Sequence, residues 1–465
     1  MFKSIKKVVR KFTGPASISG EIGVAGVKES HGYIMDEFLQ QLLLERGRKT
    51  YREMRDNDAT CSAMLFAIDM ILRGVIWRVE ENKNTKGTPA SEEAAEWLKG
   101  VLFEDMSHSW DDFIAEVLSM LVYGWEYTEI VYKVRKGSDH PDPRHRSLFN
   151  DGTIGLRKLG NRAQETLERW EIDEEGYVSG MYQRPPLGGA TRFIPIEKAL
   201  HFISSPQKGS PEGRSVLRGA YRSWYFLKNI QEVESIAIER ELNGLPVVSI
   251  PNNILNGTTT EAKAAKAAYV QLVRDIKFND QGGVVLPSDT YWDADGKPTG
   301  VKQVQLELLA SKGTRSINTS EVVLRYQREI ARTVMADFLM LGSNDRGSFA
   351  MSKDKSSLFI KSTEGWLSTI ADIINTKLIT KLWKLNNFDP DVKPRINPGS
   401  IAPVDLDELG KYISDLSRAG APLFPDDDLE AHLRTSGGLP EKGPDATAAA
   451  DDGDLSGMGT GDVEE

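Results

Sequence analysis

The hydrophobic pattern of the first 210 residues alternates between helical and strand spacing. Residues 35–74 are expected to be helical, because apolar side chains recur there every three or four positions. The clearest apolar face is formed by Met64, Ile68, Ile71 and Leu72. Shorter helices are predicted over 91–104 and 111–123, and Gly124 ends the second of them before the strand-like run WEYTEIVYKV.

Short runs rich in β-branched and aromatic residues, separated by turn residues, fill the segment 153–204. Five strands are expected there: IGLRKL, TLERWEID, YVSGMYQ, TRFIPI and ALHFI. Together with the helices before them, these strands predict an α+β fold for the first half of the chain.

Three long helical runs dominate the second half. No proline interrupts 214–242, and a helix over this run would be about 43 Å long. The pair Asn243-Gly244 favours a helix end at this point. Two further long helices are predicted over about 318–338 and 353–385. In the first of them apolar residues recur every four positions, at Val322, Tyr326, Ile330 and Val334.

A small α+β unit is expected over 245–310, with strands VVSIP, GGVVLP and VQLELL and the helix EAKAAKAAYVQLVRDI. Because two long helices flank this unit, the pattern favours a stalk that carries a head. The alternative is a pair of ordinary long core helices in a globular fold. A last helix is predicted over 406–419, and the residues from Ser436 onwards are expected to be disordered, because they contain almost no apolar side chains.

The net charge of −10 is spread unevenly over the 465 residues. The first twelve residues carry +5, residues 441–465 carry −7, and the remainder carries −8. This acidic body argues against a protein that coats nucleic acid with a uniformly basic surface. No apolar run approaches the roughly 20 residues of a membrane helix, and no apolar stretch follows the basic start to make a secretory signal.

Sequence motifs for catalysis or cofactor binding are missing. The chain contains no GxxxxGK[ST], HExxH, CxxC, EF-hand loop or GxSxG. His140 and His145 share a loop with two aspartates, so a metal site is conceivable there, but a solvated turn is the favoured interpretation. The single cysteine, Cys61, is expected to be a buried structural thiol. We therefore predict no enzyme activity, no cofactor and no bound metal.

Several strings, in their order, resemble the portal proteins of tailed double-stranded DNA bacteriophages. GSPEGRSVLRGAYRSWYFLKNIQEVESIAIERELNGLPVVSIP resembles the stem helix of that family and its exit into a strand. YGWEYTEIVY resembles a helix-to-strand passage, and SEVVLRYQREIARTVMADFLMLG resembles a second stem helix that enters a loop. AGAPLFPDDDLEAHLRTSGGLPE resembles the helical C-terminal ending of the family. The resemblance covers most of residues 50–440.

The resemblance implies a portal-like α+β protomer with a wing, a long-helix stem, a small α+β clip and a helical crown. The implied segments are a basic flexible arm at 1–20, the wing at 21–210, the first stem helix at 211–244, the clip at 245–315, the second stem helix at 316–338, a tunnel loop at 339–352, a long wing helix at 353–385, the crown at 386–435 and a disordered acidic tail at 436–465.

The resemblance also implies a homo-oligomeric ring, generally of twelve subunits, at one capsid vertex of the virion. Double-stranded DNA would pass through this ring during packaging and ejection. Terminase, head-tail adaptor proteins, and the major capsid and scaffolding proteins are the implied partners, and no stable membrane association is expected. The protein would be made in the host cytoplasm.

Two sets of residues follow from this assignment. The tunnel loop would project towards DNA through Gly342, Ser343, Asn344, Asp345, Arg346, Gly347 and Ser348. The stem would present charges to the channel or to a neighbouring subunit through Lys228, Glu232, Arg325, Arg328 and Arg332. Two other functions are compatible with the sequence: a metal-dependent nucleic-acid-processing enzyme built from scattered acidic residues, and a membrane-surface scaffold anchored by residues 1–12.

Overall fold

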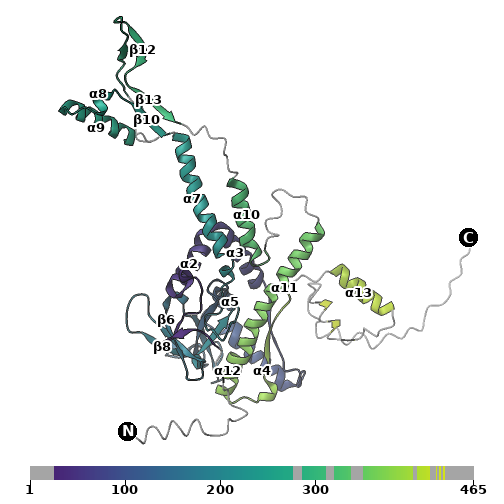
Figure 1. The fold of residues 1–465 in the computed structure, drawn as a ribbon. Coiled ribbons are helices and arrows are strands. Elements are labelled where there is room, and N and C mark those ends of the chain that lie inside the picture. The colour runs from purple at the N-terminus through teal and green to yellow at the C-terminus, as the bar shows by residue number, and fades with distance from the viewer. Residues whose placement is uncertain are drawn as a thin grey trace, which may run out of the picture.

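A computed structural model describes residue 23 and residues 26–243, 245–275, 285–309, 319–336, 349–401 and 406–418, with 426, 429, 430, 433 and 434. Figure 1 shows a mixed body, a stalk of two helices that rises from it, and a small head at the far end of the stalk. The stalk consists of α7 (Tyr221–Asn243) and α10 (Thr319–Arg332), which pack side by side. The predicted arm at 1–20, the tail at 436–465 and the proposed tunnel-loop residues 342–348 lie outside the described residues.

The body begins with helices, whose bounds differ from the predicted ones. They are α2 (Leu44–Asn57), α3 (Ala59–Arg73), α4 (Pro89–Lys99), α5 (Trp110–Val117) and α6 (Ser119–Tyr123). The helix expected from residue 35 was wrong at its start, because α2 begins only at Leu44. The single helix expected over 111–123 is interrupted at Leu118. A further break separates α2 from α3, because the Asp58 carboxylate caps α3 by accepting a hydrogen bond from the Cys61 backbone.

All five strands expected between 153 and 204 are present. The first sheet places β4 (Trp125–Val134) between β5 (Ile154–Asn161) and β9 (Ala199–Ile203), and all its pairs are antiparallel. The second sheet has the order β6 (Leu167–Ile172), β7 (Val178–Gln183) and β8 (Arg192–Pro195). Near the N-terminus, β1 (Glu29–Ser30) pairs with β2 (Tyr33–Ile34). The α+β prediction for this half of the chain is confirmed.

Distant parts of the chain complete the body. The predicted long helix at 353–385 is present as α11 (Phe349–Ile373), a π-helical segment (Ile374–Ile379) and α12 (Thr380–Asn386). Strand β14 (Arg395–Pro398) pairs with β3 (Trp77–Glu80), although the resemblance places these residues in the crown. The side-chain amide of Asn375 hydrogen-bonds both backbone groups of Ile396 and so occupies part of the other edge of β14.

Gly124 marks a tight passage from α6 into β4. Its φ of 92° is left-handed, and a Cβ atom there would lie only 2.4 Å from the Glu212 carbonyl oxygen. Behind this turn the His201 ring stacks on Trp170 with ring centroids 5.0 Å apart. Burial lowers the pKa of His201 to about 4, so its neutral ring can donate a hydrogen bond to the Pro211 carbonyl oxygen 2.8 Å away. These contacts hold the second sheet against the chain that leads to the stalk.

The head joins the stalk through one strand pair. Its elements are β10 (Leu245–Ser249), α8 (Asn252–Leu255), α9 (Thr260–Asp275), β11 (Thr290–Trp292), β12 (Pro298–Lys302) and β13 (Gln305–Leu309). β10 pairs with β13, and β11 pairs with β12 in a separate hairpin. The strand expected at GGVVLP was wrong for residues 285–287, which are not in a strand, and the rest of that run lies outside the described residues. The C-terminal helix α13 (Leu406–Arg418) matches its prediction closely.

Both stalk helices are shorter than predicted. The run from 214 does not form one helix, because the Ser215 hydroxyl caps a separate 3-10 turn at Val216–Arg218 before α7 begins at Tyr221. α10 ends at Arg332, and Met335 then adopts a left-handed φ of 60° that no helix contains. Among the described helices, none combines the length and the apolar character that crossing a bilayer requires.

Candidate stalk interface and channel surface

One face of each stalk helix is used for packing against the other. The rings of Phe226 and Tyr326 stack with centroids 6.2 Å apart. The Ser223 hydroxyl donates to a Glu329 carboxylate oxygen at 2.8 Å, and the Thr319 hydroxyl hydrogen-bonds the Glu234 carboxylate near the head. The contacts join both ends of α10 to α7, so the two helices form one unit.

The three arginines predicted on the stem share a second face of α10. Arg325, Arg328 and Arg332 are spaced i, i+3 and i+7, so they fall within about 60° of one another around the helix. Tyr326 and Thr319, which contact α7, lie about 100° or more away around the helix, and Glu329 lies between them and Arg325. Arg325 and Arg332 are exposed and Arg328 is half-buried, and the Arg325 guanidinium lies 4.9 Å from the Tyr326 ring centroid. We call these three residues the cationic face of α10.

Lys228 and Glu232 belong to another surface. The Lys228 ammonium lies 2.6 Å from a Glu53 carboxylate oxygen on α2, and this hydrogen bond raises the pKa of Lys228. The ammonium also lies 5.7 Å from the centroid of the Trp224 ring. Lys228 therefore ties the stalk to the body of its own chain. Glu232 is exposed one turn further along α7.

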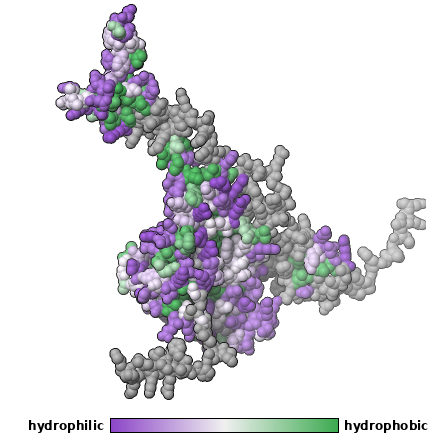
Figure 2. All heavy atoms as spheres, in the orientation of Figure 1, coloured by the Kyte–Doolittle hydropathy of each residue, from purple (hydrophilic) through white to green (hydrophobic). Residues whose placement is uncertain are grey.

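A third surface of the stalk is apolar and exposed. Tyr225, Val233 and Ile236 fall within about 80° of one another on α7. Their exposed fractions are 48%, 65% and 49%. Figure 2 shows apolar side chains gathered along the stalk between polar surfaces. We call these three residues the apolar face of α7, and Asn229 and Glu232 lie in the same sector of the helix. Exposed apolar side chains that gather on one surface are typical of a protein interface.

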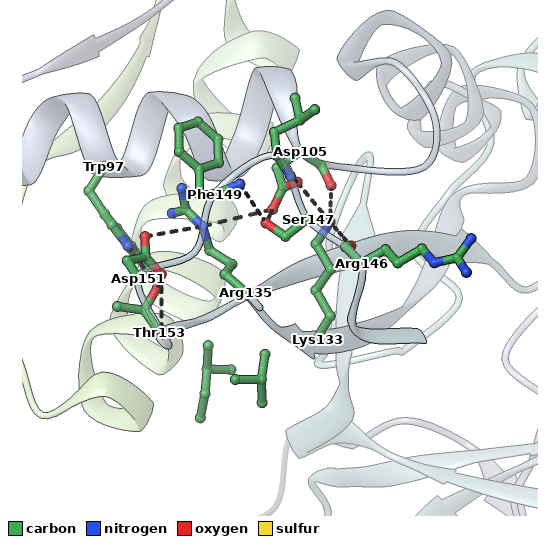
Figure 3. Close-up of polar contacts among 12 residues, drawn as sticks. Trp97, Asp105, Lys133, Arg135, Arg146, Ser147, Phe149, Asp151 and Thr153 are labelled. Atoms are coloured by element: carbon green, nitrogen blue, oxygen red, sulfur yellow. Dashed lines mark hydrogen bonds and ion pairs between the residues drawn. The ribbon is translucent and has the colours of Figure 1, made fainter. Parts of the chain in front are cut away.

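A buried charge cluster holds the loop that follows β4, as Figure 3 shows. The Asp105 side chain is 2% exposed and receives hydrogen bonds from the Ser147 hydroxyl at 2.6 Å and the Leu148 backbone at 2.9 Å. The Lys133 ammonium lies 2.9 Å from the same carboxylate. Arg135 is also buried, with its guanidinium 3.9 Å from the centroid of the Phe149 ring. The cluster neutralises two buried cations at the end of the longest strand.

Arg135 has a second anionic neighbour in the same loop. Its Nε lies 3.3 Å from an Asp151 carboxylate oxygen and 3.8 Å from Asp105. Burial lowers the pKa of Arg135, and the two carboxylates oppose that shift. Sequence reasoning missed this cluster, because its members are far apart along the chain and follow no regular spacing.

The two histidines that suggested a metal site lie in this same loop, with ring centroids 5.8 Å apart. His145 Nδ1 accepts a hydrogen bond from the Val134 backbone, and His140 Nδ1 accepts one from the Asp142 backbone. In the part of the chain that the structure describes, no three His, Cys, Asp or Glu side chains are grouped to hold a metal ion. Cys61 is buried as predicted, and burial raises the pKa of its thiol.

Comparison with known proteins identifies the family. Among solved structures, a chain from the neck of a native GTA particle computed with C12 symmetry is 13% identical, with a TM-score of 0.48 over 85% of this chain and 94% of that chain. An HK97 family phage portal protein from Corynebacterium diphtheriae is 10% identical, with a TM-score of 0.39 over 75% of this chain and 94% of that chain. The family model described as "Portal protein of Mu bacteriophage" matches residues 48–434. Because this match spans most of the chain, the protein belongs to the portal protein family of Mu bacteriophage.

Proposed function

We propose that this protein forms a homo-oligomeric ring at one vertex of a capsid and that double-stranded DNA passes through the ring during packaging and ejection. The observation that carries the proposal is the apolar face of α7 in a chain of the portal family. Within its own chain this face is left largely exposed. A neighbouring copy would cover it, and twelve copies are the expected number. The protein acts as a conduit and a docking platform, not as a catalyst.

Ring closure requires a head-to-tail contact, in which one surface of a subunit meets a different surface of the next. The side of α7 that carries Lys228 already faces the body of its own chain. The apolar face of α7 is therefore assigned to the neighbouring subunit, and the cationic face of α10 is assigned to the channel. The head would contact terminase and head-tail adaptors at one end of the channel. The body would contact the major capsid and scaffolding proteins in the virion.

The charge distribution suits a channel through which DNA moves. Tight neutralisation of many phosphates would hold DNA in place, because each released counterion adds to the affinity. The segment 13–440 carries −8, so a ring of about twelve copies is strongly acidic overall and disfavours tight coating. Three arginines per copy, arranged along one helix face, would keep the duplex near the channel axis and leave it free to slide.

Replacing Arg325, Arg328 and Arg332 together by glutamine tests the channel assignment. Rings are expected to form normally, while binding of a short DNA duplex weakens. The slope of log affinity against log salt concentration should become shallower by about 0.9 for each phosphate that the variant no longer neutralises. Fluorescence anisotropy of a labelled duplex, titrated with purified rings at several salt concentrations, measures that slope.

A matched control removes three positive charges from the body instead, through Arg192→Gln, Lys198→Gln and Lys384→Gln. This control should leave the salt dependence of DNA binding unchanged. An unchanged slope in the stalk variant would contradict the channel assignment. Loss of rings in the stalk variant would instead place the arginines in subunit contacts.

A further inference from the structure

Phe38 is exposed to solvent, and the two residues before it form ion pairs with the body. Its side chain is 91% exposed, whereas the neighbouring Glu37 and Leu39 are half-buried. The neighbouring Glu37 carboxylate forms two hydrogen bonds with the Arg218 guanidinium, at 2.6 and 2.7 Å. Asp36 pairs with Lys208 at 2.9 Å. Because the backbone is anchored, insertion of the Phe38 ring into a partner would cost little conformational entropy.

A groove of about 370 Å³ lies on the other side of the stalk base. It is formed where the 3-10 turn, the end of α10 and the middle of α11 meet. Its apolar lining comes from Val216, Val334, Met335 and Trp366. A dry cavity of about 150 Å³ is enough to bind benzene, so this groove has room for one phenyl ring. Met335 is half exposed here and would be covered by such a ring.

The two features lie at one level of the molecule. Arg218, which anchors the segment of Phe38, belongs to the same short turn as Val216, which lines the groove. Figure 1 shows α2, which follows Phe38, and α11 on opposite sides of the stalk base. In a ring whose axis runs along the stalks, one side of each subunit meets the opposite side of the next at the same level.

We propose that Phe38 of one copy inserts into the stalk-base groove of the neighbouring copy. This inference rests on the proposed ring and adds a second contact to it, at the body end of the stalk. The contact is heterologous, because an aromatic side chain meets a groove formed by other residues. It would therefore fix the angle between neighbouring subunits, which the contact between stalks alone does not.

Cysteine cross-linking tests the contact in the full-length chain. Phe38→Cys is combined with Ser362→Cys, which stands at the groove, and the protein is oxidised and run on a non-reducing gel. The natural Cys61 is buried and gives little background. We expect a ladder of covalent multimers that a reducing agent collapses to monomer. Each single variant, and the pair Phe66→Cys with Ser362→Cys, should give no ladder, because Phe66 is exposed on α3 away from the segment of Phe38.

A second variant measures how much the contact contributes to the stability of the ring. Phe38→Asp should raise the concentration at which rings dissociate at least tenfold, with no change in the urea midpoint of the isolated subunit. Intact rings without a ladder, or with unchanged dissociation in Phe38→Asp, would overturn the inference while leaving the proposed ring standing. Absence of rings in the unmodified protein would overturn both.

Discussion

The double variant Val233→Asp with Ile236→Asp is expected to be a folded monomer that forms no rings. Both side chains are about half exposed or more in the single chain, at 65% and 49%, so aspartate is tolerated there before assembly. In the ring both positions would be buried against a neighbour. Burial of a Val or Ile side chain is worth about 1.5–3 kcal/mol, and a buried unpaired carboxylate costs more. Two such changes at every interface should weaken association by about a thousandfold or more.

Native mass spectrometry and circular dichroism together check this expectation. The variant should keep the helical signal of the parent and show only the subunit mass of 51.7 kDa. The control variant Leu187→Asp with Leu385→Asp changes two other exposed aliphatic residues, at 102% and 47% exposure, and should assemble normally. Normal rings in the stalk variant would show that the apolar face of α7 is not a subunit contact.

The variant Asp105→Ala, in the body, is expected to lower the stability of the folded protein strongly. This change removes the carboxylate that lies 2.9 Å from Lys133 and near Arg135, and leaves two cations buried. Breaking a buried ion pair by removing one partner typically costs about 3–5 kcal/mol. The free energy of unfolding should fall by that amount, and hydrogen exchange should increase in the loop between β4 and β5.

Urea unfolding is best measured in the Val233→Asp with Ile236→Asp background, because ring formation would otherwise add to the apparent stability. Asp151→Ala is the matched control, since that side chain is 36% exposed and its removal should cost about 1 kcal/mol or less. A stability of Asp105→Ala within about 0.5 kcal/mol of the parent would contradict the role given to the cluster.

The local sequence pattern predicted which helices and strands form, but it did not predict where the helices end. The strands between 153 and 204 could be predicted because each is a short apolar run bounded by turn residues. The ends of α7 and α10 could not, because they depend on single contacts, such as the cap that Ser215 forms on the 3-10 turn. Asp58 likewise divides α2 from α3 within the run 35–74 that was expected to be helical.

In the candidate interface, too, features set by local spacing could be predicted from the sequence, whereas contacts between distant residues could not. The cationic face of α10 follows from the spacing of its three arginines, which is visible in the sequence itself. The partner of Lys228 does not, because Glu53 lies 175 residues away along the chain. The apolar face of α7 could be identified only after the structure showed which side of the helix packs against α10. Phe38 lies in the run that was expected to be helical, but α2 begins after it and its side chain is exposed.

Native mass spectrometry of the unmodified full-length chain tests the proposed ring most directly. We predict a single closed assembly near twelve times 51.7 kDa, or about 620 kDa, with a central hole in negative-stain images. A species of 51.7 kDa that persists at high protein concentration, with no rings on the grid, would contradict the proposal.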